Sequence, residues 1–277
     1  MLTVLTIDDR TYKGKLTKLF SAVSWNSLKV QVCQEPVKIT HLKYINRRGK
    51  INWNKIGKYS REDRGGLLYS GKLPLPDNAG IKLFEPVELR QRLCSNMALS
   101  ALEIMKDVPK KLRVGLYDPE GEFADLPEHF LKFTDNLIVV TKNYRVYSEQ
   151  ADRLLFEKGA VLSVSPHVSL LSTCGLIVSP SPLDISFTPM SSAVVLTCHK
   201  PSVSLACRVY YKYSFRLENS LEKLKPQDLD TEVFAGGLYS LCGMYALGSL
   251  IPLVCTGDTD TQTALSLRRY LACSFST

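Results

Sequence analysis

The sequence predicts an α/β protein in which a smaller β-rich (α+β) N-terminal domain precedes a three-layer domain built on a parallel sheet. The larger domain is predicted because short apolar runs alternate with helical patterns over residues 112–182, the rhythm of a doubly wound sheet. The smaller domain is predicted from alternating or β-branched apolar runs within residues 1–82. The 277 residues are 45% hydrophobic and 22% charged, as in chains with a packed core.

The N-terminal domain is expected to span residues 1–84. Its strands are expected at Leu2–Ile7, Ser27–Cys33 and Val37–Asn46. Gly, Asn and Pro then interrupt the chain repeatedly and predict a long loop region over residues 46–72.

A connecting segment is expected over residues 85–110, with a helix over 85–106. Apolar residues at helical spacing form a stripe along this helix: Leu93, Met97, Ala101, Ile104 and Met105. Pro86 suits the first turn of a helix, and Pro109 follows its end. The stripe indicates packing of the helix against a core.

The sheet domain is expected to span residues 111–277. Its strands are expected at Leu112–Tyr117, Leu137–Thr141, Val161–Ser165, Leu176–Ser179, Ala193–Cys198 and Val203–Tyr213. Between the second and third strands, Asn143 and Gly159 have the residue types of a helix N-cap and C′ position. Further helices are expected near Glu232–Cys242 and Thr261–Leu271.

The turn after the first strand of the sheet domain reads DPEGEF over residues 118–123. A dinucleotide-binding domain carries G-x-G-x-x-G here, because the backbone must approach the pyrophosphate closely. This turn has one glycine, Gly121, and it belongs to a stretch with carboxylates at 118, 120, 122 and 125 that would repel a pyrophosphate. The favoured interpretation is structural: Asp118 caps a first helical turn, or Asp125 and Glu128 form a capping-box-like pair at the start of a shorter helix with Pro127 in its first turn. A metal-assisted acidic site is the alternative.

The second strand is followed by Thr141, Lys142, Asn143 and Arg145. An NAD site places an acidic residue at this strand end to bind the ribose hydroxyls, whereas Lys142 and Arg145 would favour a phosphate and therefore NADP. Basic residues are also common at ordinary exposed helix starts, so both interpretations stay open.

The order of elements over residues 85–200 resembles the Rossmann-like NAD(P)-binding superfamily. It is similar to the two-domain layout of shikimate dehydrogenase and glutamyl-tRNA reductase, in which a helix leads from an N-terminal catalytic domain into the nucleotide domain. A cofactor bound as in this superfamily would contact Gly121, Thr141, Lys142, Asn143, Arg145 and Ser179. The turn at 118–123 departs from the glycine pattern of the superfamily, which argues against cofactor binding and redox chemistry.

The candidate groups for proton transfer are His199 and Asp118, both at expected strand ends. The favoured interpretation of His199 is an ordinary residue at the end of a strand. Cys198 is not expected to form a dyad with it, because adjacent residues of a strand point to opposite faces. The eight cysteines include no C-x-x-C pair, so no zinc site is expected and the thiols are predicted to be reduced.

The net charge of +8 is concentrated between residues 38 and 64, a window that contains nine basic and two acidic residues. Tyr44, Trp53 and Tyr59 lie among these cations, and aromatic residues interleaved with Lys and Arg suit single-stranded nucleic acid or another polyanion. A solvated loop face is the favoured interpretation. Charge pairing of this loop with the acidic stretch at 118–125 is a third.

The function expected from these observations is that of a Rossmann-like binding or regulatory protein that has lost standard dinucleotide binding. The alternative is an atypical NADP-dependent oxidoreductase with a site between the domains. A weaker alternative is nucleic-acid or polyanion binding through residues 38–64. The expected partners are a small molecule or anionic ligand and a second copy of the chain. No membrane is expected, because no window approaches ~20 apolar residues. A cytoplasmic location is expected, because the first nine residues read as a strand and not as an export signal.

Overall fold

A computed structural model describes residues 2–8, 22–32, 35–45, 51–60, 66–69, 71, 75–76, 80–105, 107–242 and 250–275. The chain forms two compact units. Unit 1 comprises Met1–Leu89 with Leu217–Tyr245, and unit 2 comprises Arg90–Arg216 with Ala246–Thr277. The sequence boundaries placed residues 217–245 in the sheet domain, whereas their contacts group them with the N-terminal unit.

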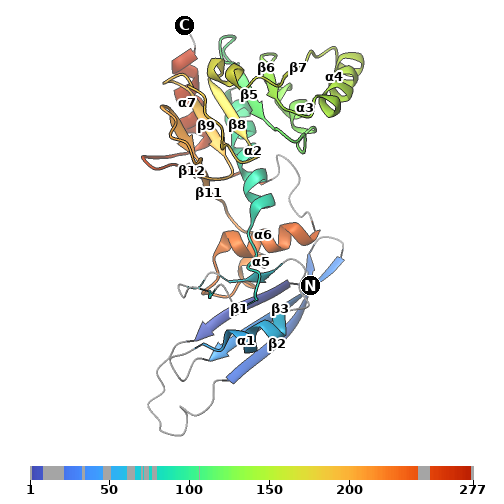
Figure 1. The fold of residues 1–277 in the computed structure, drawn as a ribbon, viewed down its shortest axis with the longest axis vertical. Helices are drawn as coiled ribbons and strands as arrows, with labels where there is room; N and C mark the ends of the chain where they lie inside the picture. The colour runs from blue at the N-terminus through green and yellow to red at the C-terminus, as the bar shows by residue number, and fades with distance from the viewer. Residues whose placement is uncertain are drawn as a thin grey trace. The chain divides into compact units, whose positions relative to one another are not determined.

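Unit 1 contains a mixed four-stranded sheet in the order β2-β3-β1-β4 (Figure 1). The strands are β1 (Leu2–Asp8), β2 (Ala22–Val32), β3 (Glu35–Ile45) and β4 (Leu67–Leu68). Strand β1 is parallel to β3 and β4, while β2 is antiparallel to β3. The three longer strands confirm the β-rich N-terminal domain, although β2 begins five residues earlier than predicted.

The loop predicted over residues 46–72 is wrong in part, because it contains helix α1 (Trp53–Ser60) and strand β4. The side chain of Asn52 accepts the backbone N–H of Lys55 at 3.0 Å, which caps the first turn of α1. Ile56 is buried in the core of unit 1 beside Leu5 and Leu42. The helix has only eight residues and includes Gly57 and two lysines, so the helical spacing of Trp53 and Ile56 was too short a pattern to reveal it.

Two further helices belong to unit 1, α5 (Asn219–Glu222) and α6 (Thr231–Cys242). Helix α6 confirms the helix predicted near Glu232–Cys242. A Cβ at Gly236 would lie 2.4 Å from the Cβ of Pro86. This glycine therefore permits close packing of α6 against the segment that precedes α2 (Val87–Met105).

Unit 2 is built on a six-stranded, all-parallel sheet in the order β10-β9-β8-β5-β6-β7. The strands are β5 (Val114–Tyr117), β6 (Leu137–Val140), β7 (Ser163–Ser165), β8 (Leu176–Ser179), β9 (Val194–Thr197) and β10 (Arg208–Tyr210). Counted along the chain from β5, this is the strand order 3-2-1-4-5-6 of a dinucleotide-binding sheet. The α/β class is confirmed, and the sheet is consistent with a Rossmann-like domain.

The connections of this sheet are only partly helical. Helices α3 (Leu126–Phe130) and α4 (Tyr144–Lys158) and the 3-10 helix η2 (Val168–Thr173) follow β5, β6 and β7 in turn. Residues 180–193 and 198–207, which lead into β9 and β10, are described in full and contain no helix. Helix α7 (Ala264–Phe275) and α2 lie beside the sheet (Figure 1).

A small antiparallel sheet completes unit 2, in the order β11-β12-β13. Its strands are β11 (Lys212–Ser214), β12 (Val254–Thr256) and β13 (Thr261–Gln262). The single strand predicted over Val203–Tyr213 is therefore wrong, because β10 joins one sheet and β11 another. The helix predicted at Thr261–Leu271 starts three residues later, because β13 precedes it. Across the described ranges, no helix is both long enough and apolar enough to cross a membrane.

Candidate functional site

The position at which a Rossmann-like sheet binds its ligand lies between β5 and β8, the neighbouring strands from which the chain winds in opposite directions. Ligands of such sheets bind outside the carboxyl ends of the strands at this point. Asp118 follows β5 there, and Ser179 is the last residue of β8. Both side chains are 0% exposed, so neither lines an open site.

Asp118 binds the turn that follows it. Its Oδ1 accepts the backbone N–H groups of Gly121 and Glu122, each at 3.1 Å, and its Oδ2 accepts that of Phe123 at 2.8 Å. Its Oδ2 also accepts the hydroxyl of Tyr147 on α4 at 2.6 Å. Backbone N–H groups in the equivalent turn of dinucleotide-binding domains bind phosphate oxygens. Here they converge on a carboxylate of the chain itself.

The same turn is held from outside by the start of α4. The side-chain amide of Asn143 donates to Glu120 O at 3.0 Å, and the backbone N–H of Lys142 donates to Pro119 O at 3.0 Å. Gly121 adopts a φ of +79°, and a Cβ there would lie 3.2 Å from the side chain of Asn143. These contacts fix the turn against α4.

Asn143 occupies the N-cap position of α4, but its side chain makes no capping hydrogen bond because it binds the turn. The prediction that Gly159 ends this helix is confirmed, since Gly159 follows the last residue of α4 with a φ of +65°. Burial, followed by the negative charge of Asp118, raises the pKa of Tyr147 well above its usual range. Its hydroxyl therefore remains protonated and donates to Asp118.

The predicted cofactor-binding residues fall into two groups. Thr141, which is buried, uses its hydroxyl to donate to Pro119 O at 3.4 Å and to accept the N–H of Asn143 at 3.0 Å. Ser179 donates to Ser181 O at 2.6 Å. Lys142 and Arg145 are exposed, and Arg145 lies 3.7 Å from Glu149 on its own helix. The structure brings Asp118, Gly121, Thr141 and Asn143 together as one self-bonded turn.

The candidate proton-transfer residue His199 contacts Cys198, with 2.9 Å between Nδ1 and Sγ. The expectation that these neighbours point apart is wrong, because β9 ends at Thr197 and strand alternation no longer applies beyond it. Burial raises the pKa of the Cys198 thiol to about 12, and the thiol donates to Pro180 O at 2.7 Å. A neutral, buried thiol lacks the thiolate character of a catalytic nucleophile.

A metal-assisted acidic site at the turn finds no support. Within the described ranges, no three His, Cys, Asp or Glu side chains are placed to hold a metal ion. Asp125 is at the N-cap of α3 but makes no side-chain capping bond, and Glu128 instead binds Arg153 at 2.8 Å and Lys158 at 2.5 Å. The predicted capping box is therefore absent, although Pro127 does lie in the first turn of the helix.

The basic window at 38–64 is described only in part. Arg47, Arg48, Lys50, Arg61 and Arg64 lie outside the described residues, as does the side chain of Tyr59. Tyr44 is 0% exposed, and its hydroxyl accepts the N–H of Asn52 at 3.0 Å. Trp53 packs edge-on against Tyr69, with 6.1 Å between ring centroids. Tyr44 is thus unable to stack on a nucleic-acid base.

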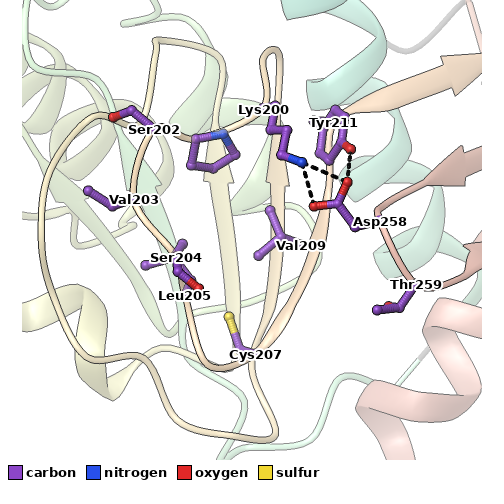
Figure 2. Close-up of a pocket in the computed structure, with 11 residues that line it drawn as sticks. Lys200, Ser202, Val203, Ser204, Leu205, Cys207, Val209, Tyr211, Asp258 and Thr259 are labelled. Carbon is purple, nitrogen blue, oxygen red and sulfur yellow. Dashed lines mark hydrogen bonds and ion pairs between the residues drawn. The ribbon is translucent and has the colours of Figure 1, made fainter.

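Unit 2 has a cavity of about 410 Å³ beside β10, at a place that no sequence motif indicated. One wall is the loop at 200–205 and the other is the turn at 258–259, with Cys207, Val209 and Tyr211 between them. Figure 2 shows Lys200 and Tyr211 pointing at Asp258, with Cys207 at the opposite end in this view. The walls lie more than fifty residues apart in the chain, so no local motif could reveal the cavity.

The polar end of this cavity is formed by an ion pair between Lys200 and Asp258 and by the hydroxyl of Tyr211. Lys200 Nζ lies 2.8 Å from Asp258 Oδ2 and 2.9 Å from Oδ1, and the Tyr211 hydroxyl donates to Oδ1. The bond from Lys200, followed by that from Tyr211, lowers the pKa of Asp258. The bond to Asp258 raises the pKa of Lys200. Both groups therefore remain charged at neutral pH.

A second cavity, of about 600 Å³, lies before the amino ends of β5 and β6 and is lined by residues 108–110 and 131–136. Its charged lining residues are Lys110, Lys132 and Asp135. Neither cavity lies at the switch point between β5 and β8. The residues predicted to bind a cofactor line neither of them.

Comparison with known proteins found no match: no family model matches the chain, and neither a curated protein nor a solved structure matches it.

Proposed function

We propose that this chain is a Rossmann-like binding or regulatory protein that has lost standard dinucleotide binding and carries out no hydride transfer. The observation that carries the proposal is the occupation of the first turn by the carboxylate of Asp118. Three backbone N–H groups that would hold a pyrophosphate donate to Asp118 at 2.8–3.1 Å.

The energetic argument concerns what a pyrophosphate would have to displace. Hydrogen bonds to charged groups contribute about 1.5–3 kcal/mol each, and Asp118 accepts three from the backbone and one from Tyr147. A cofactor phosphate in this turn would leave Asp118 buried, without its donors and next to a like charge. A cost of several kcal/mol lowers affinity by more than about a hundredfold.

The test is calorimetric titration of the full chain with NADP, NAD and ATP. We expect no measurable heat of binding from any of the three at millimolar ligand. Binding of a dinucleotide in the micromolar range would overturn the proposal.

An atypical NADP-dependent oxidoreductase is the second candidate, and it is favoured by one observation. Lys142 and Arg145 stay exposed at the end of β6, where a 2′-phosphate would be bound. Lys142→Glu tests this candidate: it should weaken NADP binding and leave NAD binding unchanged. Equal NADP affinity before and after the substitution would reject the candidate, as would a lack of NADP binding by the unaltered chain.

A further inference from the structure

The cavity beside β10 is lined by a crossover of the sheet that contains no helix. In a doubly wound sheet the crossover between parallel strands is usually a helix that covers one face. Here residues 198–207 connect β9 to β10 without one. Leu205, Cys207 and Val209 pack against the hydrophobic core of unit 2 on one side, and they remain partly exposed. The cavity floor is therefore apolar surface that a ligand could cover.

The wall opposite the loop is held close to β10. A Cβ at Gly257 would lie 2.1 Å from Val209 O, and the N–H of Tyr211 donates to Thr256 O at 3.2 Å. These contacts fix the turn that carries Asp258. Lys200 comes from the loop, so the ion pair joins the two walls at one end of the cavity (Figure 2).

The charges at this end determine which ligand fits. A simple anion inserted beside Lys200 would face the carboxylate of Asp258, and a simple cation beside Asp258 would face the ammonium of Lys200. A molecule that carries both an ammonium and a carboxylate can insert between the two. Its carboxylate then binds Lys200, its ammonium binds Asp258, and every charge keeps an opposite partner.

The remaining lining suits such a molecule. The hydroxyls of Ser202, Ser204 and Thr259 lie along the walls, and a volume of about 410 Å³ is in the usual range of small-molecule sites. A nucleotide phosphate is a poor occupant, because Asp258 cancels the charge of Lys200. We propose that this cavity binds a free amino acid with an apolar side chain, which lies on Leu205 and Val209 while its charged groups insert between Lys200 and Asp258.

The proposal rests on the proposed binding function, but the two are tested with different ligands. Three probes of similar shape separate the charged groups: L-leucine, 4-methylpentanoate, which lacks the ammonium, and 3-methylbutylamine, which lacks the carboxylate. In titrations of the full chain by calorimetry and ligand-observed NMR, we expect L-leucine to bind with a Kd below about 1 mM. Each singly charged probe should bind at least about tenfold more weakly.

Variants then assign the binding to this cavity. Lys200→Met and Asp258→Asn should each weaken L-leucine binding at least about tenfold. Both side chains are 60% exposed, so the fold should persist, which far-UV circular dichroism checks. Ser204→Phe, from an exposed position in the lining, should fill the cavity and abolish binding.

The matched controls are Lys223→Met and Glu149→Gln, which remove exposed charges elsewhere and should leave binding unchanged. The proposal is overturned if L-leucine shows no saturable binding, if 4-methylpentanoate binds as tightly as L-leucine, or if binding survives Lys200→Met and Asp258→Asn. Absence of L-leucine binding would leave the proposed loss of dinucleotide binding intact. Dinucleotide binding would overturn that function without affecting the result at the cavity.

Discussion

Replacement of Asp118 should destabilise unit 2 strongly, because the carboxylate is the common acceptor of the turn at 118–123. In Asp118→Ala, the N–H groups of Gly121, Glu122 and Phe123 and the hydroxyl of Tyr147 all lose their acceptor. An unsatisfied buried donor costs about 1–3 kcal/mol. Water can reach part of the turn, so we expect the free energy of unfolding to fall by about 3–5 kcal/mol in total.

Two milder variants each remove only part of these hydrogen bonds and so separate their contributions to stability. In Asp118→Asn, the amide oxygen can still accept from Gly121 and Glu122, while the amide N–H₂ group faces the N–H of Phe123. We expect a loss of about 1–3 kcal/mol, because the N–H of Phe123 loses its acceptor and the Tyr147 hydroxyl must accept from the amide in place of donating to a carboxylate. Tyr147→Phe removes a single hydrogen bond to a charged group and should cost about 1.5–3 kcal/mol. The order of stability should be wild type, then the two milder variants, then Asp118→Ala.

The measurement is urea unfolding followed by far-UV circular dichroism, with hydrogen exchange of the peptide over residues 118–126 as the local readout. Both tryptophans, Trp25 and Trp53, belong to unit 1, so their fluorescence follows that unit and not the turn. Glu120→Gln and Glu122→Gln are the controls, since these exposed side chains should change stability by less than about 0.5 kcal/mol. An Asp118→Ala protein with wild-type stability and exchange would refute the reasoning.

Three other predictions follow from single contacts. Lys158 lowers the pKa of Glu128. The ionised carboxylate should therefore stabilise the fold by up to about 1 kcal/mol above its unfolded pKa, and this stabilisation should be lost as pH falls through its folded pKa. Glu128→Gln should remove that pH dependence from urea titrations. Gly257→Ala should cost more than about 2 kcal/mol of unfolding free energy, because its Cβ would lie 2.1 Å from a β10 carbonyl oxygen; an unchanged urea midpoint would contradict this. Cys198, whose pKa is raised to about 12, should react with iodoacetamide at pH 8 far more slowly than exposed Cys273, which peptide mass spectrometry resolves; equal rates would contradict the buried thiol.

Local sequence pattern predicted the four central strands of unit 2, β5, β6, β8 and β9, because each one is a short buried apolar run between polar turns. The strand β8 (Leu176–Ser179) was predicted with its observed ends. The pattern failed at Val203–Tyr213, where two short strands follow each other along the chain but join different sheets. Which partner a strand binds depends on residues far away in the sequence, and alternation within the strand carries no such information.

The candidate site shows the same limit. The sequence indicated that four carboxylates occupy the phosphate turn, and this argued against a conventional cofactor. It did not indicate that one of them, Asp118, points into the turn and accepts three backbone N–H groups. The signal was present in part, because an aspartate three to five residues before those N–H groups has the spacing of a local cap. The contribution of Tyr147 comes from another helix and is visible only in the fold.

The self-bonded turn and the cavity of unit 2 both depend on the segment that follows a strand of the parallel sheet. After β5, the chain supplies its own anion to the donors of the turn, so the usual ligand position is filled. After β9, the chain supplies no helix, so apolar residues of the core edge remain partly exposed beside an ion pair. The donors of the turn are bound to a buried carboxylate, whereas the ion pair beside β10 is 60% exposed and lies next to partly exposed apolar surface that a ligand can cover. A ligand of this domain should therefore bind at the edge strand β10 and not at the switch point between β5 and β8.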